Sequence, residues 1–376
     1  MKDSGKRVIL MVSNDLTCDN RVHKMAVTLC KSGYSVLVVG RELPNSISLS
    51  DVCYEQKRLK LFCKKGPWFY AEMNLRYFLF LMFHSFDIAT ANDLDTLLGV
   101  YCATKIKKKE IVYDCHEYYT EVPELANRER VRNIWDSIER MIFPKLKYCM
   151  TVCDSISESY QREYGVEVAV VRNLPQKTNY DFEPISLNLP CEKVILYQGA
   201  LNVGRGLELL IKSMAFIDDA CLLIVGSGDV ADDLQVLALM ENVADKIVFA
   251  GRVKCDELKY YTKLATIGVS LEEDLGLNYR FALPNKIFDY IQAGKPILIS
   301  DLPEMSKIVL QYQCGELVTS RTPENLAKQI NELLHDNQKL EQYSLQSTIA
   351  ARKLCWENEE NIVQNIYRKI SLKKDC

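Results

Sequence analysis

The sequence contains no apolar run that approaches the roughly 20 residues needed to cross a bilayer. No secretory signal precedes the first strand pattern, which begins at residue 7. The net charge is only −3, so the overall charge gives no reason to expect a nucleic-acid partner. Together these absences predict a cytoplasmic protein that does not bind nucleic acid.

A complete zinc site is also missing, although the chain has 14 cysteines. Cys149 and Cys153 are spaced C-x3-C, but no second pair or nearby histidine completes a tetrahedral set of ligands. Scattered cysteines in the cytoplasm are usually buried, reduced thiols. We therefore expect no metal site.

Apolar residues are plentiful, at 48% of the 376 residues, which is enough for two cores and too many for a disordered chain. Continuous apolar segments alternate with helical patterns, beginning with a strand at 8–12 and a helix with Val22, Met25 and Leu29 on one side. Strands buried on both faces are typical of parallel sheets covered by helices. The predicted fold class is α/β, with Rossmann-like parallel sheets.

The α/β pattern restarts at a strand over 194–197, after a stretch of little periodicity that contains three prolines. We predict a first domain over residues 1–173, a linker over 174–192 and a second domain over 193–355. A final helix within 356–376 is expected to cross back to the first domain.

A glycine-rich loop lies between the first strand and the first helix of the second half. It contains Gly199, Gly204 and Gly206, with Arg205 between the last two. Such a loop lets the backbone approach an anion, and the guanidinium adds charge and forked donors. The alternative is a tight turn with a surface arginine, but the glycine spacing favours an anion-binding loop.

The next strand ends in residues 226–231, which match the dinucleotide fingerprint G-x-G-x-x-A through Gly226 and Gly228. Two features argue against a dinucleotide. The match follows the second strand of its domain instead of the first, and no acid follows about 20 residues later at the next strand end. We interpret it as a ligand-facing loop of another kind.

The stretch 276–296 contains a helix start that suits a phosphate. Pro284 precedes an apolar-periodic run, and Asn285, Lys286 and Asp289 fall within one turn. Free N–H groups and the helix dipole favour an anion there, Lys286 adds a full charge, and Asp289 can accept from sugar hydroxyls. A solvated helix start with ordinary charges is an equal alternative from this stretch alone.

In the first half, His116 and Glu117 directly follow a strand at 111–113, where catalytic groups of α/β sheets gather. For a lone dipeptide, a structural histidine bonded to a neighbouring carboxylate is the stronger interpretation. The basic segment 57–65 and the apolar run 77–83 suggest a core helix with a basic edge, and an interfacial membrane helix is the alternative.

Taken together, these motifs resemble a known family. H-E follows a mid-chain strand, G-A-x-x-x-G-R-G follows the linker, and G-S-G, G-R-V and P-N-K-I-F-D-Y-I-Q-A-G-K-P come in that order. The set is similar to the retaining nucleotide-sugar glycosyltransferases of family 4, of the bacterial surface-polysaccharide type. The resemblance spans nearly the whole chain and is strongest over 194–300. It implies a GT-B fold, in which two Rossmann-like domains face each other across a cleft.

The resemblance also implies roles for individual residues. Arg205 and Lys286 would act on the donor diphosphate, and His116 would face the reacting sugar. Asp289 matches the second glutamate of the family's E-x7-E motif, which binds ribose hydroxyls. The rest of the donor site would comprise Gly199, Gly204, Gly206, Gly226, Gly228, Arg252 and Asn285. The acceptor side would comprise Asn20, Arg21, Asn92 and Glu117.

The chain departs from the family pattern at two positions. Phe281 stands where the first glutamate of E-x7-E is expected, and Ala200 replaces the usual arginine. We expect Glu273 or Asp274 to supply the missing acid.

The expected function is metal-independent transfer of a hexosyl group from a nucleoside-diphosphate sugar to a hydroxyl of a glycan or lipid-linked acceptor. No other cofactor is expected, and the expectation leaves open a peripheral contact with the cytoplasmic face of the inner membrane. The alternatives are a nucleotide-sugar 2-epimerase, an NAD(P)-dependent oxidoreductase that uses the Gly226-Ser227-Gly228 loop, and a non-catalytic nucleotide-sugar binder.

Overall fold

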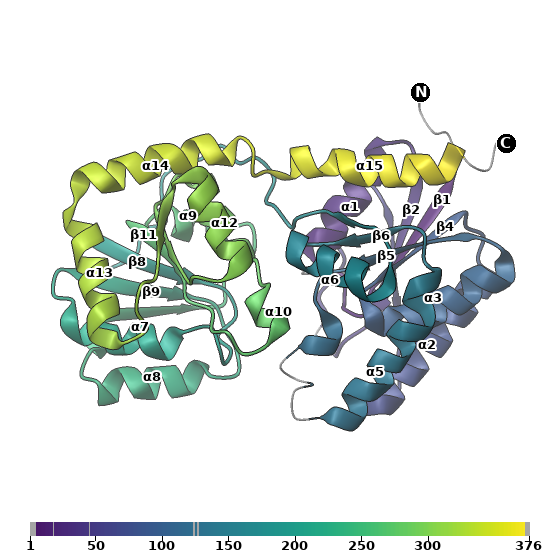
Figure 1. Cartoon of the computed structure of the whole chain (residues 1–376), viewed down its shortest axis with the longest axis horizontal. Helices are drawn as coiled ribbons and strands as arrows, with labels where there is room; N and C mark the ends of the chain where they lie inside the picture. Colours follow the sequence, from purple (N-terminus) through teal and green to yellow (C-terminus); the bar gives the residue numbers. More distant parts are fainter. Residues whose placement is uncertain (1–4, 18, 45, 123–124, 126–127, 373–376) are drawn as a thin grey trace. The chain divides into compact units, whose positions relative to one another are not determined.

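The computed structural model describes residues 5–17, 19–44, 46–122, 125 and 128–372 (Figure 1). The chain folds into two compact units, of which the first combines residues 1–173 with residues 359–376. The second unit is the single stretch 174–358. Residues 373–376 of the predicted crossing helix lie outside the described residues.

The first unit contains a seven-stranded parallel sheet in the order β3-β2-β1-β4-β5-β6-β7. Its order reverses direction between β1 and β4, and ligands of such sheets bind beyond the carboxyl ends of the strands at this point. The strands are β1 (Arg7–Met11), β2 (Ser35–Arg41), β3 (Glu55–Leu59), β4 (Ile88–Asn92), β5 (Glu110–Cys115), β6 (Cys149–Thr151) and β7 (Val168–Val170). The helices are α1 (Asn20–Lys31), α2 (Gly66–Phe83), α3 (Leu94–Lys107), α5 (Glu129–Ile142), α6 (Asp154–Tyr164) and α15 (Trp356–Leu372).

The second unit repeats this plan with a six-stranded parallel sheet in the order β10-β9-β8-β11-β12-β13. Its direction reverses between β8 and β11. The strands are β8 (Lys193–Gln198), β9 (Ala220–Val225), β10 (Ile247–Gly251), β11 (Ile267–Ser270), β12 (Ile297–Ile299) and β13 (Gly315–Leu317). The helices are α7 (Leu207–Ser213), α8 (Ala231–Met240), α9 (Leu258–Thr262), α10 (Leu277–Arg280), α11 (Asn285–Gln292), α12 (Pro303–Tyr312), α13 (Pro323–His335) and α14 (Asn337–Ala351). The predicted α/β fold class with parallel sheets is confirmed.

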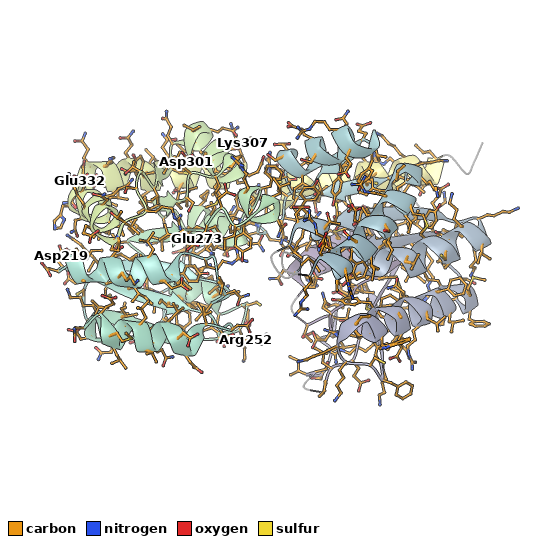
Figure 2. All side chains as sticks on the ribbon, turned by 60° about the horizontal axis from the view of Figure 1, so that its bottom comes forward. Asp219, Arg252, Glu273, Asp301, Lys307 and Glu332 are labelled. Atoms are coloured by element: carbon orange, nitrogen blue, oxygen red, sulfur yellow. The ribbon has the colours of Figure 1, made fainter. Side chains whose placement is uncertain are left out.

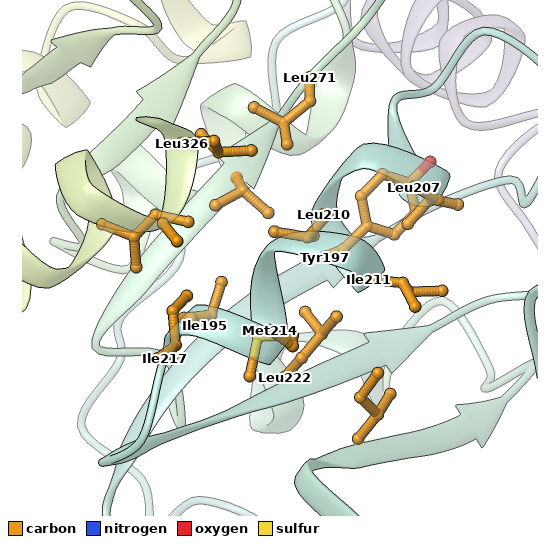
Figure 3. Close-up of a cluster of buried hydrophobic side chains, with 14 of the residues drawn as sticks. Ile195, Tyr197, Leu207, Leu210, Ile211, Met214, Ile217, Leu222, Leu271 and Leu326 are labelled. Atoms are coloured by element: carbon orange, nitrogen blue, oxygen red, sulfur yellow. The ribbon is translucent and has the colours of Figure 1, made fainter. Parts of the chain in front are cut away.

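Alternate residues of β8 enter two different cores, because side chains alternate between the faces of a strand. Ile195 and Tyr197 belong to a cluster that includes Leu207 and Leu210 of α7 (Figure 3). Val194 and Leu196 belong to a second cluster, which includes residues of α11 and α12. Both faces of the sheet are therefore buried, as the continuous apolar strands predict.

Residues 174–192 have no helix or strand, but they pack against the second unit. Leu174 is fully buried in one of its cores. The Phe182 ring meets the Tyr260 ring edge-on, with centroids 4.7 Å apart. The backbone oxygen of Phe182 accepts a hydrogen bond from Lys263. The predicted linker is thus an ordered covering segment of the second unit.

Helix α15 packs within the first unit through polar contacts at several points along its length. The Tyr367 hydroxyl lies 2.6 Å from the Thr90 hydroxyl of β4, and a Glu359 carboxylate oxygen accepts from the Arg172 N–H at 2.9 Å. Within the described ranges, no helix is both long enough and apolar enough to traverse a bilayer.

Candidate active site

The two glycine loops of the second unit pack against each other at the carboxyl ends of β8 and β9. Gly226 has a φ of +150°, and a Cβ atom there would collide with the backbone oxygen of Gly199. Gly206 has a φ of +71°, and its Cβ would collide with the backbone of Leu271, just after β11. Glycine is needed at both positions because a side chain would push the loops apart. The close approach brings the ends of β8, β9 and β11 together.

Glu272 lies at the centre of this loop cluster and is fully buried. Its Oε1 atom is 2.7 Å from Lys286 Nζ and 3.6 Å from a terminal nitrogen of Arg205. Its Oε2 accepts a hydrogen bond from the Ser270 hydroxyl at 2.6 Å. Arg205 and Lys286, which are 81 positions apart in the sequence, therefore meet at one carboxylate.

The ion pairs of Glu272 shift the pKa of its carboxyl group. Burial alone raises the pKa of a carboxyl group, but the adjacent Lys286 ammonium and the Ser270 hydroxyl bring the pKa of Glu272 below its usual value. Glu272 is thus a buried carboxylate anion that holds two cations. Because one negative charge is matched by two positive charges, this cluster has an excess of one positive charge.

Aromatic rings fix the two cations from the other side. Lys286 Nζ lies 4.2 Å from the centroid of the Tyr197 ring, and Arg205 lies 5.3 Å from that of Tyr279. Lys286 Cε also lies 3.4 Å from the position that a Cβ of Gly199 would take. The buried Nε of Arg205 has no hydrogen-bond partner among the described residues. The guanidinium therefore keeps donor capacity that the described part of the protein does not use.

Asp289 lies one turn beyond Lys286 on α11 and accepts from Gln198 Nε2 at 3.0 Å. Gln198 is itself fixed, because its Oε1 accepts from Thr262 at 2.8 Å. Asn285 is exposed at the first position of α11. Asp289 thus stands at the carboxyl end of β8, beside the loop that begins at Gly199.

Other predicted donor residues lie around this cluster without contacting Glu272. Gly228 packs against Leu201, and Gly204 packs against Tyr279, so both help to shape the glycine loop. Arg252 is exposed just after β10 (Figure 2), and β10 is tied to the second glycine loop where Gly226 N–H donates to the Gly251 oxygen at 2.8 Å.

The buried acid of the cluster is Glu272, whereas Glu273 and Asp274, which are expected to replace the missing sugar-contacting acid, are partly exposed. Glu273 is 37% exposed and pairs with Arg321 at 3.8 Å, and Asp274 is 47% exposed and pairs with Arg280 at 3.7 Å. All three acids follow β11 directly. Glu272 points inward, because side chains alternate along the direction of the strand. The loop turns outward after Glu272, so Glu273 and Asp274 do not point inward.

A second charged cluster lies at the carboxyl ends of β4 and β5 in the first unit. His116 Nε2 is 2.9 Å from Asp114 Oδ2, and its Nδ1 is 3.2 Å from Asp93 Oδ2. Burial lowers the pKa of a histidine, but here the carboxylates of Asp93 and Asp114 outweigh it, so the pKa of His116 is well above its usual value. His116 is therefore an imidazolium held between two acids. In the sequence analysis, the stronger interpretation of the His116-Glu117 pair is a structural histidine bonded to a carboxylate. The geometry of His116 is of this kind.

Arg21, on helix α1, is the second cation of this cluster. Its Nε and one terminal nitrogen donate to the two Asp114 oxygens at 3.0 and 2.7 Å, and the other donates to the Val171 oxygen at 2.6 Å. Arg21 is 3% exposed. Its guanidinium therefore fixes the Asp114 carboxylate.

The other predicted acceptor-side residues divide into two groups. Asn92 is buried and donates to the Met11 oxygen at 2.9 Å, while its own Oδ1 has no partner among the described residues. Asn20, at the start of α1, and Glu117, next to His116, are exposed. Only the exposed pair presents whole side chains to solvent.

Asp93 is a site residue that the sequence motifs do not identify. It has φ +63° and ψ 166°, a backbone conformation that is costly for any residue except glycine. Its Oδ1 accepts the His116 N–H at 2.7 Å, and its own N–H donates to the Asp114 oxygen at 2.9 Å. The position at a strand end, directly after Asn92, is the only sequence signal that could have identified it.

No described group of three or more histidine, cysteine, aspartate or glutamate side chains is arranged to hold a metal ion. One cluster is excess-positive, and the other balances two acids against two cations. Both lie at the reversal point of a doubly wound sheet, which defines the class as a two-sheet α/β protein that binds ligands at strand ends.

Comparisons with known proteins show which families within this class the chain resembles. A family model described as "Glycosyl transferases group 1" matches residues 181–348. An uncharacterised glycosyltransferase of Methanocaldococcus jannaschii is 29% identical over 191 residues, which cover 47% of this chain and 45% of that protein. Phosphatidyl-myo-inositol mannosyltransferase of Mycobacterium leprae is 23% identical over 220 residues, covering 57% and 54%. The chain thus spans about half the length of these curated relatives.

Solved structures match over nearly the whole chain. Sucrose-phosphate synthase from Thermosynechococcus elongatus has a TM-score of 0.77 at 18% identity, covering 97% of this chain and 99% of that one. Anabaena HepE, crystallised with UDP-glucose, has a TM-score of 0.72 at 14% identity, covering 98% and 100%. At these identities the likeness shows the fold, which is of the GT-B type. Residues 181–348 thus match the group 1 glycosyltransferases, in line with the resemblance to family 4 that the motifs carry.

Proposed function

We propose that this chain transfers a hexosyl group from a nucleoside-diphosphate sugar to a hydroxyl of a glycan or lipid-linked acceptor, with retention of configuration. The observation that carries the proposal is the convergence of Arg205 and Lys286 on the buried carboxylate of Glu272. Two cations against one acid leave a positive charge at the carboxyl ends of β8 and β11. A diphosphate is the anion that suits such a site beside a helix N-terminus.

The relatives support a nucleotide-sugar donor. HepE, which shares the fold, was crystallised with UDP-glucose, and two curated relatives are named mannosyltransferases. In this chain, the Lys286 ammonium has three N–H donors. It makes one hydrogen bond to Glu272, at 2.7 Å. The remaining donors, with the Arg205 guanidinium, would face the diphosphate.

The same groups can assist the bond-breaking step. When the bond between the sugar and the diphosphate breaks, negative charge collects on the leaving diphosphate. Lys286, Arg205 and the free N–H groups of α11 would stabilise that charge in place, without reorganisation. The acceptor hydroxyl would attack from the face that the diphosphate leaves, and its proton would pass to a diphosphate oxygen. Asp289 would accept hydrogen bonds from the ribose.

The first-unit cluster would serve the acceptor side. Its imidazolium and guanidinium balance the two carboxylates, so it has no excess charge with which to compete for the diphosphate. Because both ring nitrogens of His116 face acids, His116 would fix the Asp93 and Asp114 carboxylates instead of removing a proton. Asn20 and Glu117, which are exposed and directly adjoin Arg21 and His116 in the sequence, would contact the acceptor.

The first test is a donor screen followed by one substitution. Thermal shift against UDP, GDP, ADP and their sugars identifies the donor, because a ligand stabilises the folded state that binds it. Arg205→Ala should then lower the rate of nucleoside-diphosphate release by a factor of about 100 to 1,000, which corresponds to roughly 2.7–4 kcal/mol of lost charge stabilisation. The fold should be preserved, since Arg205 is 28% exposed.

Arg280→Ala is the matched control, because Arg280 lies in the same unit, is 55% exposed and pairs with Asp274 outside the Glu272 cluster. Equal turnover of Arg205→Ala and Arg280→Ala would remove Arg205 from the donor site. NMR of the donor incubated alone separates transfer from a 2-epimerase, which needs no acceptor. Transfer requires that C2 of the sugar keep its configuration.

A further inference from the structure

A cavity of about 780 Å³ lies within the first unit, between helices α2, α3 and α5. Figure 1 shows α5 running alongside α2 and α3. Leu75 and Ile134 of the cavity's lining are each 57% exposed, so the cavity is open to solvent, and its volume falls within the range of small-molecule pockets. It lies apart in the sequence from the donor loops, which are all in the second unit.

The lining of the cavity is apolar along one face of each helix. Helix α5 contributes Val131, Ile134, Trp135 and Ile138, at the spacing of a helical stripe. Trp135 forms an aromatic wall with the Tyr70 and Tyr119 rings, whose centroids lie 5.0 and 5.3 Å from it. The cavity therefore suits a ligand with a long hydrocarbon surface.

The polar side chain of Asn74 does not change this character. Its Nδ2 donates to the backbone oxygens of Tyr70 and Asp95 at 2.9 and 2.7 Å, and its Oδ1 accepts from Gly99 N–H at 2.8 Å. All of these bonds are made within the helices. Asn74 joins α2 to α3 and offers nothing to a ligand.

Charge occurs only at the exposed rim. Among the described lining residues, Glu117 and Arg128 are the charged ones, and both are exposed. Lys64 and Lys65 are exposed and directly precede the rim residue Gly66. The rim thus has the cationic side chains of Arg128, Lys64 and Lys65 beside the acids Glu117 and Glu129, and these cations can hold an anionic head group outside an apolar interior.

The rim also joins the acceptor-side cluster. Glu117 lines the cavity and is covalently next to His116, whose ring lies between Asp93 and Asp114. A molecule with its chain in the cavity would therefore hold its head near the carboxyl end of β5. That edge is where the proposed acceptor must present its hydroxyl.

We propose that this cavity binds the hydrocarbon chain of a lipid acceptor whose anionic phosphate head lies at the rim of Lys64, Lys65 and Arg128. This inference rests on the proposed sugar transfer and names the lipid-linked class of acceptor. The chain is held by apolar contact with α2, α3 and α5, and the phosphate is held by the cationic side chains. Farnesyl phosphate and dodecyl phosphate have the same 12-carbon main-chain length, and comparing them distinguishes an isoprenoid from a straight chain.

Cys102 provides a direct readout, because it lines the cavity, is partly exposed and is a free thiol. Either phosphate should slow alkylation of Cys102, followed by peptide mass spectrometry, by at least tenfold at saturation. Cys255 is an exposed free cysteine in the second unit and should react at an unchanged rate. Shortening the chain by two carbons should weaken binding about tenfold, because each buried CH₂ contributes to affinity.

Ala71→Trp fills the cavity from an exposed position on α2, so the fold should tolerate it. It should weaken binding of both phosphates at least tenfold. Leu79→Trp is the control, because Leu79 is 42% exposed on the same helix and does not line the cavity. Equal binding by both variants, or unprotected Cys102 at saturating phosphate, would overturn the proposal and indicate adsorption to the apolar surface.

Nucleoside-diphosphate binding is measured on the same samples by thermal shift. If the proposed donor site is wrong, the diphosphate shift is absent although Cys102 can still be protected. If only the chain site is wrong, the diphosphate shift remains and Cys102 protection is lost. A straight-chain or an isoprenoid preference supports the proposal equally and specifies the acceptor.

Discussion

The charged clusters of the two units are arranged in opposite senses. In the first unit a cation, His116, lies between the carboxylates of Asp93 and Asp114. In the second unit a carboxylate, Glu272, lies next to the cations Lys286 and Arg205. Both clusters occupy the reversal point of a parallel sheet with the same strand order, so the fold alone does not set their charge. The residues at the strand ends decide which kind of ligand each sheet attracts.

The difference follows from how each cluster is balanced. Arg21 adds a second cation beside Asp114, so the two cations of the first cluster are matched by the carboxylates of Asp93 and Asp114, with the buried carboxyl group of Asp95 nearby. Lys286 and Arg205 face only one buried acid, because Glu273 and Asp274 turn outward to other partners. A balanced cluster is suited to neutral hydroxyls, and an excess-positive one to a diphosphate.

The largest expected effect comes from breaking the second cluster. Lys286→Met removes the closest partner of a fully buried carboxylate and should lower the free energy of unfolding by about 3 kcal/mol, as for other buried pairs that lose one partner. Urea unfolding measures this change. In the double variant Lys286→Met/Glu272→Gln the unpaired charge is gone, so most of the stability should return. A double variant no more stable than Lys286→Met would show that Glu272 is not the cause.

An intermediate effect is expected from raising the pH, and it arises in the first cluster. The raised pKa of His116 means that its ion pairs stabilise the folded state fully below about pH 6.5, the usual value, and that this contribution is lost as the pH rises through the folded pKa. Asp93→Asn should lower the His116 pKa, as followed by NMR of the ring protons. Asparagine has the size of aspartate and keeps an Oδ1 atom that can accept from the His116 N–H, so the backbone should be kept.

Asp219→Asn controls for a general charge effect, because Asp219 pairs with His335 in the second unit, at 2.9 Å. It should leave the titration of His116 unchanged. A wild-type His116 that titrates near 6.5 would contradict the imidazolium between two acids.

The smallest effect is expected from the outward acid of the second cluster. Glu273→Gln removes only a half-exposed pair with Arg321 at 3.8 Å, and such pairs are worth about 0–1 kcal/mol. Donor affinity and unfolding should barely change. A large loss of turnover in Glu273→Gln, with Glu272→Gln remaining active, would reverse the assignment of the two acids.

The buried strands of the fold were predictable from the sequence, and two edge strands were not. Strands such as β1 and β8 are apolar throughout because both of their faces are covered by helices. β3 (Glu55–Leu59) has the sequence EQKRL, and β13 (Gly315–Leu317) has only three residues. Each lies at the edge of its sheet and has one neighbouring strand. These two edge strands lack the apolar signal, although the edge strands β7 and β10 have it.

The sequence indicates the site loops but not which side chains point inward. The glycine spacing identifies the loop of Arg205, and Pro284 marks the helix start of Lys286. The motifs could not separate Glu272 from Glu273, since the choice depends on where the chain turns after β11. They could not give Asp93 its role either, because its positive φ is set by its hydrogen bonds to His116 and Asp114.

Helix α15 has a consequence for how the protein is made. Its Tyr367 contacts Thr90 inside the first unit, yet the ribosome adds residues 359–372 only after the whole of the second unit. The second unit, a single stretch, can acquire its native form during synthesis, whereas the first must wait with the surface around Thr90 uncovered. The half of the protein that is translated first is therefore the half that is finished last.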